Sequence, residues 1–218
     1  MFSEFVSPDH SSLKICGVTT RHDALQLADL GVSALGFNFW PESKRYCTPE
    51  RASLISSHIG GRILRVGVFV NNSRPLAADL VDDCVIDVVQ LHGDEGEDDI
   101  AFFLSQKIPV IRAVSATALP AYPLPSKNFA LLIDTPAGQE YGGTGKTFDW
   151  SLARDYALAH PQVPLILAGG ITPENASEAL DALQPSRPVA LDVASGAELS
   201  PGIKDFAKVK DLLATLAS

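Results

Sequence analysis

The feature that most constrains the fold is the regular alternation of short apolar runs with amphipathic segments from Leu13 to the end of the sequence. Eight of these runs are rich in Val, Ile and Leu over nearly their whole length, which is typical of parallel strands buried on both faces. We expect strands at Leu13–Val18, Ala34–Phe39, Ile63–Val70, Val85–His92, Pro109–Ser115, Phe129–Thr135, Pro164–Ala168 and Val189–Ala194.

Helix signals stand between the apolar runs. Thr20, Thr48 and Thr172 each occupy an expected N-cap position and are followed by an early carboxylate, with a proline between at the last two. The last amphipathic segment has an apolar stripe that begins at Ile203. The unit after Ser115 is the weakest, because its prolines leave room for little helix.

Eight strand-and-helix units in a chain of this length predict the α/β class and a single (β/α)8 TIM barrel. A doubly wound open sheet is the alternative, but its Gly-x-Gly-x-x-Gly fingerprint is missing after the first run, where Cys16-Gly17-Val18-Thr19 stands. We expect residues 13–218 to form one barrel domain. We expect residues 1–12 to be a flexible leader, because they contain acidic residues and no long apolar run.

The composition excludes several classes of protein. A formal net charge of −9 argues against binding to nucleic acid, which depends on a surplus of Lys and Arg. No stretch approaches the ~18 consecutive apolar residues of a membrane span. Cys16, Cys47 and Cys84 are far apart and form no Cys-x-x-Cys pair, so we expect no disulfide framework, no metal site and a cytoplasmic location. We interpret Cys47 and Cys84 as structural.

In a barrel of this type, chemistry gathers at the C-terminal ends of the strands. Polar or glycine residues follow the apolar runs at these points: Cys16, Asn38, Asn71, His92, Arg112, Asp134, Gly169, Gly170, Asp192 and Ser195. A cysteine such as Cys16 is commonly a small packed side chain, and to act as a base it needs a nearby cation or N–H dipoles. A carboxylate such as Asp134 is costly to bury unless it is hydrogen-bonded or takes part in chemistry, which suits a general acid.

Ligand contacts are expected on the loops around these two residues. Arg45, after the second run, is either a solvated charge or the bidentate holder of a carboxylate. His92 is either a core histidine, which the residue alone favours, or a ring-stacking wall of the site. Glycine-bearing loops after the last three runs predict a phosphate site made of backbone N–H groups. We assign substrate binding to Arg45, His92, Gly143, Gly169, Gly170, Asp192, Ser195 and Gly196.

Together these motifs resemble the phosphoribosylanthranilate isomerase family of tryptophan biosynthesis over nearly the whole chain after Leu13. The resemblance rests on Lys14-Ile15-Cys16-Gly17, Gly36-Phe37, Ser43-Lys44-Arg45-Tyr46, Val66-Gly67-Val68-Phe69-Val70-Asn71, Val89-Gln90-Leu91-His92-Gly93, Asp134, the segment 141–150, Ala168-Gly169-Gly170 and Asp192-Val193-Ala194-Ser195-Gly196. It implies a barrel without a cofactor that converts N-(5-phosphoribosyl)anthranilate to 1-(2-carboxyphenylamino)-1-deoxyribulose 5-phosphate by an acid/base Amadori rearrangement. It also implies Cys16 as general base, Asp134 as general acid and Arg45 as holder of the anthranilate carboxylate.

Three other interpretations remain open at this level. A related aminoaldose isomerase of histidine biosynthesis would have an aspartate where Cys16 stands, and a non-catalytic phosphate-binding barrel would need neither Cys16 nor Asp134. A P-loop kinase is disfavoured, because Glu140 stands where a motif ending in Gly145-Lys146-Thr147 requires glycine. The sequence does not decide between monomer and homodimer, whether a second aminoaldose is accepted, whether the loop 136–147 closes, or what Lys146 does.

Overall fold

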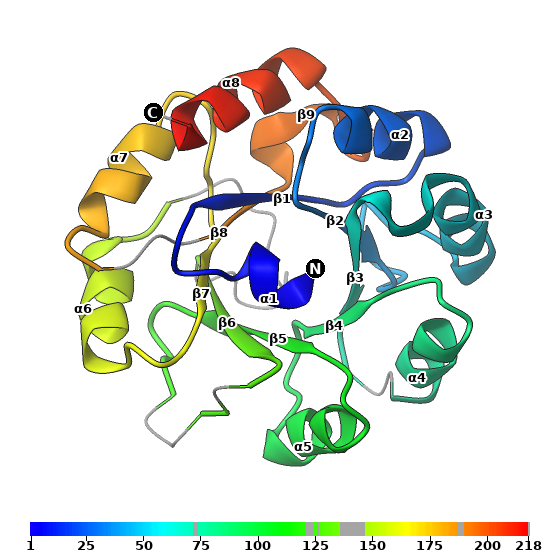
Figure 1. Cartoon of the computed structure of the whole chain (residues 1–218), viewed down its shortest axis with the longest axis horizontal. Helices are drawn as coiled ribbons and strands as arrows, with labels where there is room; N and C mark the ends of the chain where they lie inside the picture. Colours follow the sequence, from blue (N-terminus) through cyan, green and yellow to red (C-terminus); the bar gives the residue numbers. More distant parts are fainter. Residues whose placement is uncertain (72–73, 121–123, 126, 136–146, 187–189, 218) are drawn as a thin grey trace.

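A computed structural model describes residues 1–71, 74–120, 124–125, 127–135, 147–186 and 190–217. Eight parallel strands close into a barrel in the order of the sequence, and helices surround it (Figure 1). The strands are β1 (Ser12–Cys16), β2 (Ala34–Asn38), β3 (Leu64–Phe69), β4 (Val88–Leu91), β5 (Val110–Ser115), β6 (Phe129–Asp134), β7 (Leu165–Leu167) and β8 (Ala190–Val193). The (β/α)8 fold expected from the apolar runs is confirmed.

A helix follows every strand except β5 in the part of the chain that the structure describes, and the unit after Ser115 was the weakest in the sequence. The helices are α2 (Arg21–Asp29), α3 (Pro49–Ile59), the short 3-10 helix η1 (Gly60–Arg62), α4 (Arg74–Asp82), α5 (Glu97–Ser105), α6 (Ser151–Ala159), α7 (Ala176–Ala182) and α8 (Phe206–Leu216). Thr20 and Thr48 cap α2 and α3 as expected, since each side-chain oxygen accepts a hydrogen bond from a backbone N–H three residues later. Within the described residues, no helix is long and apolar enough to cross a membrane.

The start of α7 differs from the expectation at Thr172. The side-chain oxygen of Asn175 accepts a hydrogen bond from the Thr172 N–H at 2.8 Å, and the Asn175 amide donates to the Gly170 carbonyl at 3.0 Å. These contacts hold the residues between as a turn, so the helix begins only at Ala176.

Alternate strand residues divide the core into two layers, because successive side chains of a strand point to opposite faces. One apolar cluster lies between the strands and the helices and includes Leu13, Ile15, Leu131, Ile133 and Leu191. The other fills the barrel interior and includes Ala34, Leu64, Val88, Ile111, Leu132 and Ala190. The interior layer becomes polar toward the C-terminal ends of the strands, which is the end where barrels of this type carry their sites.

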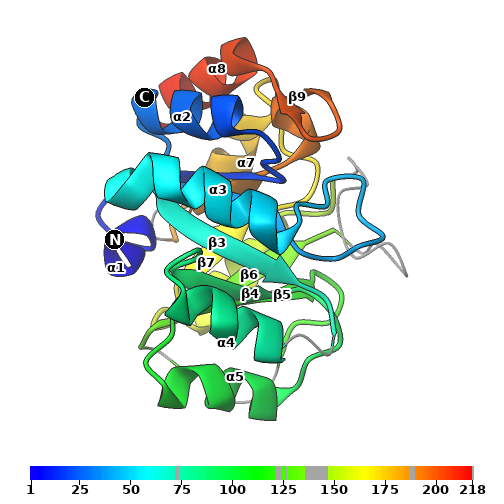
Figure 2. The ribbon, with the colours of Figure 1, turned by 90° about the vertical axis from the view of Figure 1, so that its right-hand side faces the viewer.

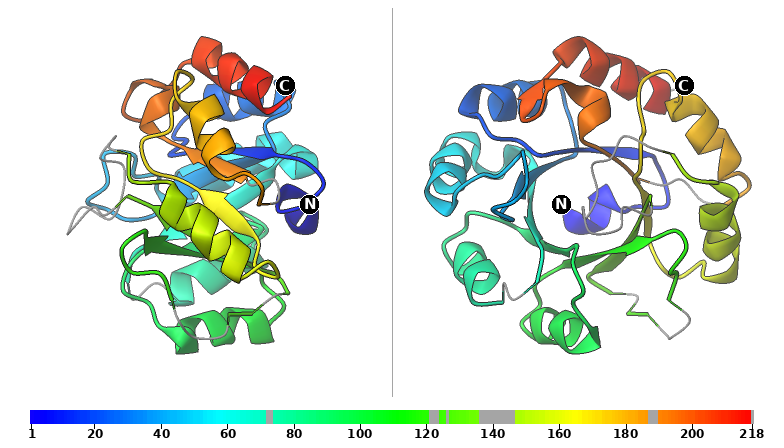
Figure 3. Two further views of the ribbon diagram at one scale, coloured as in Figure 1. Left: turned by 90° about the vertical axis from the view of Figure 1, so that its left-hand side faces the viewer. Right: turned by 180° about the vertical axis from the view of Figure 1, so that it is seen from behind.

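The N-terminal segment is packed against the barrel, which corrects the expectation that residues 1–12 form a loose leader. Residues Phe2–Phe5 form helix α1, and Phe5 is only 3% exposed within the interior cluster. Helix α1 lies inside the ring of strands in views along the axis (Figures 1 and 3) and at one end of the barrel in side view (Figure 2). Because α1 leads into the start of β1 and packs on the interior cluster, it closes the end opposite the site.

A small hairpin between β8 and α8 is absent from the sequence expectation. After the 3-10 helix η3 (Ser195–Ala197), strands β9 (Glu198–Ser200) and β10 (Ile203–Lys204) pair antiparallel. Ile203, expected at the start of the last helix, lies in β10 and is 41% exposed. Helix α8 begins later because Asp205 caps it, accepting hydrogen bonds from the N–H groups of Ala207 and Lys208.

Candidate active site

Four of the expected site residues project into the barrel at its C-terminal end. His92, Asp134 and Asp192 lie two or four positions after interior residues of their own strands, and the period of two places them on the interior face. Cys16 faces the same way, because it alternates with Leu13 and Ile15 of the outer cluster. Cys16 ends β1 and Asp134 ends β6, so β7 and β8 separate them around the ring. The strand geometry therefore places a thiol and a carboxylate at the barrel mouth on two non-adjacent strands.

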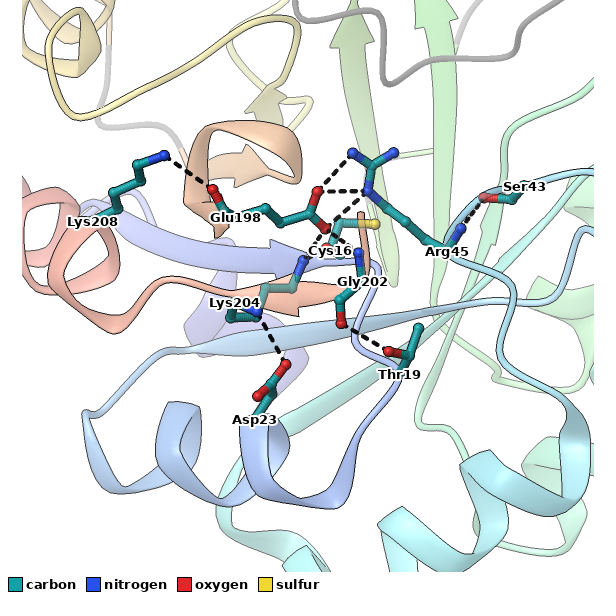
Figure 4. A network of polar contacts seen from close by, with 9 residues as sticks. All are labelled: Cys16, Thr19, Asp23, Ser43, Arg45, Glu198, Gly202, Lys204 and Lys208. Carbon is teal, nitrogen blue, oxygen red and sulfur yellow. Dashed lines mark hydrogen bonds and ion pairs between the residues drawn. The ribbon is translucent and has the colours of Figure 1, made fainter. Parts of the chain in front are cut away.

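Cys16 lies between two lysines. Gly36 on the neighbouring β2 leaves room beside it, since a Cβ there would lie 2.9 Å from the Cys16 sulfur and 3.2 Å from the Lys14 nitrogen. Lys204 of β10 donates a hydrogen bond to the Cys16 carbonyl oxygen (Figure 4). Burial raises the pKa of the Cys16 thiol, while the charges of Lys14 and Lys204 oppose that rise. The cations that a basic cysteine needs are thus present.

Lys14 and Asp192 form an ion pair inside the barrel. The Lys14 Nζ lies 2.8 Å from Asp192 Oδ1, and the lysine side chain is 0% exposed. Burial alone would lower the pKa of Lys14, but Asp192 and Cys16 raise it above its ordinary value, so the ammonium stays charged. Asp192, expected to bind substrate, therefore has a partner within the protein and fixes the cation beside Cys16.

Asp134 is held at the mouth by two neighbours. Its Oδ1 accepts a hydrogen bond from the Thr135 N–H at 2.7 Å, and its Oδ2 lies 3.5 Å from His92 Nε2. The His92 Nδ1 lies 2.9 Å from the amide nitrogen of Gln90, a side chain with 0% exposure. This buried amide contacts the ring nitrogen of His92 that faces away from Asp134, and so helps to fix the orientation of the imidazole. His92 is therefore a wall of the site and a neighbour of Asp134.

Arg45 reaches the same region from the loop after β2, but it is already engaged by a carboxylate of the protein. Its Nε and Nη2 lie 2.9 and 2.7 Å from the two carboxylate oxygens of Glu198. Burial alone would lower the pKa of Arg45, but its hydrogen bonds to Glu198 raise it, so the guanidinium stays charged. The expected bidentate carboxylate contact thus exists within the chain, and its partner is Glu198.

The glycine-bearing loops lie where the sequence placed them. Gly169 and Gly170 follow β7, and Ser195 and Gly196 lie in η3 directly after β8, with all four residues partly exposed. Backbone N–H groups on adjacent loops of this kind suit a phosphate. Gly143, Glu140 and Lys146 lie outside the described residues.

Two members of the polar ring point elsewhere. Arg112 alternates with the interior residues Ile111 and Ala113, and its guanidinium lies 3.0 Å from Glu95 on the outer side of the barrel. The Asn71 N–H donates to the same carboxylate at 2.7 Å. Both therefore support the loop after β4 and do not face the barrel interior.

Three residues of the site were missed by the sequence interpretation: Lys14, Glu198 and Lys204. Lys14 had a signal, because a lysine between two aliphatic residues in a buried strand needs a partner. Glu198 and Lys204 lie on a hairpin of two very short strands that leave no periodic pattern.

The other cysteines differ from one another. Cys47 is buried, as expected, and burial raises its pKa to about 11. Cys84 is exposed, which corrects its interpretation as a packed structural residue. Among the described residues there is no group of three or more His, Cys, Asp or Glu side chains able to hold a metal ion.

Comparison with known proteins identifies the family. Residues 13–215 match the family model for N-(5'phosphoribosyl)anthranilate (PRA) isomerase. The chain is 41% identical over 200 residues to N-(5'-phosphoribosyl)anthranilate isomerase of Thermotoga maritima, covering 91% of this chain and 94% of that protein. It is 40% identical over 204 residues to the enzyme of the same name from Geobacter metallireducens, covering 92% and 96%.

Solved structures agree with the sequence match. The crystal structure of phosphoribosyl anthranilate isomerase from Thermus thermophilus has a TM-score of 0.80 at 38% identity, covering 94% of this chain and 98% of that one. A phosphoribosyl anthranilate isomerase in complex with reduced 1-(o-carboxyphenylamino)-1-deoxyribulose 5-phosphate has a TM-score of 0.76 at 34% identity, covering 95% and 98%. The fold, the residues at the barrel mouth and these matches agree, and the chain belongs to the N-(5'-phosphoribosyl)anthranilate isomerase family.

Proposed function

We propose that Cys16 is the general base and Asp134 the general acid with which this chain isomerises N-(5-phosphoribosyl)anthranilate. The reaction is that of its family, a step of tryptophan biosynthesis that yields 1-(2-carboxyphenylamino)-1-deoxyribulose 5-phosphate. The observation that carries the assignment is the position of the two side chains, which project into the barrel from the ends of β1 and β6. Two groups on separated strands can act on opposite sides of one sugar.

The acid acts first. Asp134 donates a proton to the furanose oxygen while the bond between that oxygen and C1 breaks, and the nitrogen lone pair forms the C1=N bond of an iminium ion. His92 and the Thr135 N–H orient the carboxyl group, because they contact its two oxygens separately. The proton is therefore delivered from a fixed position at the mouth.

The base acts second. The Cys16 thiolate removes the proton from C2, and the electrons of that C–H bond form the enolamine as the iminium nitrogen is neutralised. The enolamine then tautomerises to the ketone. Lys14 and Lys204 favour the thiolate against the burial that raises its pKa, so both lysines support the base without contacting the sugar carbon in this scheme.

Substrate binding is assigned to the remaining mouth residues. Arg45 meets the anthranilate carboxylate, and the loops that contain Gly143, Gly169, Gly170, Ser195 and Gly196 hold the phosphate. A phosphosugar ligand is supported by the relative that binds reduced 1-(o-carboxyphenylamino)-1-deoxyribulose 5-phosphate. No cofactor takes part in these steps.

The assembly and location are part of the same proposal. A solved relative from Thermotoga maritima is described as a dimeric enzyme converted to monomers, and we keep both monomer and homodimer for this chain. A cytoplasmic location is supported by the biosynthetic family. Light scattering on the purified chain, without and with substrate, distinguishes the two assemblies.

Turnover of the variants Cys16→Ala and Asp134→Asn tests the catalytic assignment. Each should lower kcat by about a hundredfold or more, the scale of losing a general acid or base, without loss of the folded state. Cys47→Ala is the matched control, since it removes a buried thiol outside the site. The assay forms phosphoribosylanthranilate in situ and follows the loss of its anthranilate fluorescence. Near-normal kcat in either variant would refute that residue's role, and no catalysed loss by the native chain would favour a non-catalytic phosphosugar-binding barrel.

A further inference from the structure

Glu198 is a buried carboxylate that joins three parts of the mouth (Figure 4). Its side chain is 4% exposed. Oε1 accepts hydrogen bonds from Lys204 Nζ at 2.8 Å, from Arg45 Nε at 2.9 Å and from the Gly202 N–H at 3.1 Å. Oε2 accepts from Arg45 Nη2 at 2.7 Å. Every one of these partners is a donor, so the carboxylate is held in one orientation and its lone pairs are occupied.

This carboxylate in turn fixes the arginine. The Arg45 side chain crosses Gly17, the residue after Cys16, so closely that a Cβ on Gly17 would collide with it. Two of the three guanidinium nitrogens are occupied by Glu198, and Nη1 has no hydrogen-bond partner in the part of the chain that the structure describes. Arg45 therefore presents one edge to a ligand rather than its full fork.

The charges of the cluster leave a positive balance. Arg45 and Lys204 contribute two cations and Glu198 one anion, which leaves one net positive charge beside Cys16. Burial lowers the pKa of Lys204, and the carboxylate of Glu198, 2.8 Å from its Nζ, opposes this lowering. Lys204 also donates to the Cys16 carbonyl, so the same cluster contacts the strand end that carries the thiol.

We propose that Glu198 is a positioning residue for the substrate, holding Arg45 so that its Nη1 edge meets the anthranilate carboxylate end-on. Lys204 fixes the position of Glu198 relative to Cys16, since its Nζ donates both to Glu198 and to the Cys16 carbonyl at the end of β1. The inference rests on the proposed role of Arg45 and adds the residue that orients it. Without Glu198, the guanidinium is free to rotate away and two buried cations face one another.

Affinity for two reduced product analogues tests the inference. The first is reduced 1-(o-carboxyphenylamino)-1-deoxyribulose 5-phosphate, and the second is its phenylamino counterpart without the carboxylate. In Glu198→Gln, the side-chain NH2 group replaces one carboxylate oxygen and faces N–H donors, with which it cannot form a hydrogen bond. Calorimetry should then show a Kd for the first analogue raised about tenfold or more, from the loss of charge-assisted bonds. The Kd for the second should not change. Glu198→Asp, which keeps the charge but shortens the side chain, should show the same selectivity and serves if the glutamine variant does not fold.

A double variant shows whether Glu198 acts through Arg45. On an Arg45→Ala background, Glu198→Gln should not raise the Kd of the first analogue further. Asp87→Asn is the matched control, because Asp87 makes an equally short bidentate pair with Arg65 at the opposite end of the barrel. It should lower the melting temperature and leave both Kd values unchanged.

Three results would overturn the inference. Equal weakening of both analogues in Glu198→Gln would show a general structural role for Glu198. If the first analogue binds more weakly to Arg45→Ala but normally to Glu198→Gln, the positioning role of Glu198 is refuted and the contact between Arg45 and the carboxylate stands. If Arg45→Ala binds the first analogue with an unchanged Kd, both the carboxylate contact of Arg45 and the positioning role of Glu198 are refuted.

Discussion

Replacing Lys14 by methionine should reduce both the stability of the fold and the fraction of Cys16 that is ionised at neutral pH. The ammonium is 0% exposed and lies 2.8 Å from Asp192, so its removal leaves a buried carboxylate unpaired. Breaking a buried pair in this way costs about 3–5 kcal/mol. For a domain of this size each kcal/mol lowers the melting temperature by about 2–4 °C, so we expect a loss of roughly 6–20 °C.

The same substitution should change the pH dependence of activity. Burial already raises the pKa of Cys16, and Lys14 is the largest opposing influence. Because the proposed base acts as its thiolate, we expect kcat/KM to rise with pH until the thiol is ionised. Loss of the cation raises the thiol pKa further, so the rising limb moves to higher pH and kcat/KM at neutral pH falls about tenfold or more. Initial rates over a pH series, with the fluorescence assay, measure this shift.

A double variant separates the two effects. In Lys14→Met with Asp192→Leu both charges of the pair are gone, and replacement of a buried pair by apolar side chains is often close to neutral for stability. The melting temperature should therefore recover. The alkaline displacement of the pH profile should persist but be smaller than in Lys14→Met, because Asp192 raises the pKa of Cys16 by less than Lys14 lowers it. An unchanged pH profile in Lys14→Met, with only the melting temperature lowered, would refute the electrostatic role of Lys14.

Three further outcomes follow from the geometry. Burial would raise the pKa of Glu198 but Arg45 and Lys204 hold it below its ordinary value, so its stabilisation is present above the ordinary pKa and is lost as pH falls through the lowered one. The free energies of unfolding of the native chain and of Glu198→Gln, measured with urea, should therefore become more similar as the pH is lowered. A difference that stays constant with pH would contradict this. Exposed Cys84 should react first with a thiol reagent and buried Cys47 not at all in the native state, as mass spectrometry of the digests would show. Phe5→Ala should lower the free energy of unfolding by no more than about 3–5 kcal/mol, measured by urea unfolding, and should leave KM unchanged, since α1 closes the end opposite the site.

The barrel was predictable because each strand has a recognisable apolar pattern within its own few residues. Runs such as Phe129–Thr135 are aliphatic on both faces, and the observed β6 differs from that run by one residue at its end. Thr20 and Thr48 were identifiable as caps because capping depends on residues three positions apart. Elements that are determined by residues close together in the sequence could thus be predicted from it.

The parts of the site that were missed depend on long-range contacts. Arg45 was expected to face a ligand carboxylate, and no local pattern indicates that a residue 153 positions away supplies one. The N-terminal helix was also missed, because Phe5 is buried only by a barrel that the rest of the chain must first form. The family resemblance implies catalytic roles for Cys16 and Asp134, but it gave no role to the cations around the thiol.

The contacts around Cys16 also bear on the order in which this protein acquires its activity during folding. Lys14 pairs with Asp192 across 178 positions of sequence, and Lys204 bonds to the end of β1 across 188. Both contacts cross the seam between β8 and β1, where the two ends of the chain meet. A nascent or truncated chain that contains Cys16 and Arg45 but lacks the last hairpin has neither Glu198, the partner of Arg45, nor Lys204, the partner of the β1 end. Recovery of analogue binding on refolding should therefore report closure of the ring, and should come later than the formation of helix and sheet.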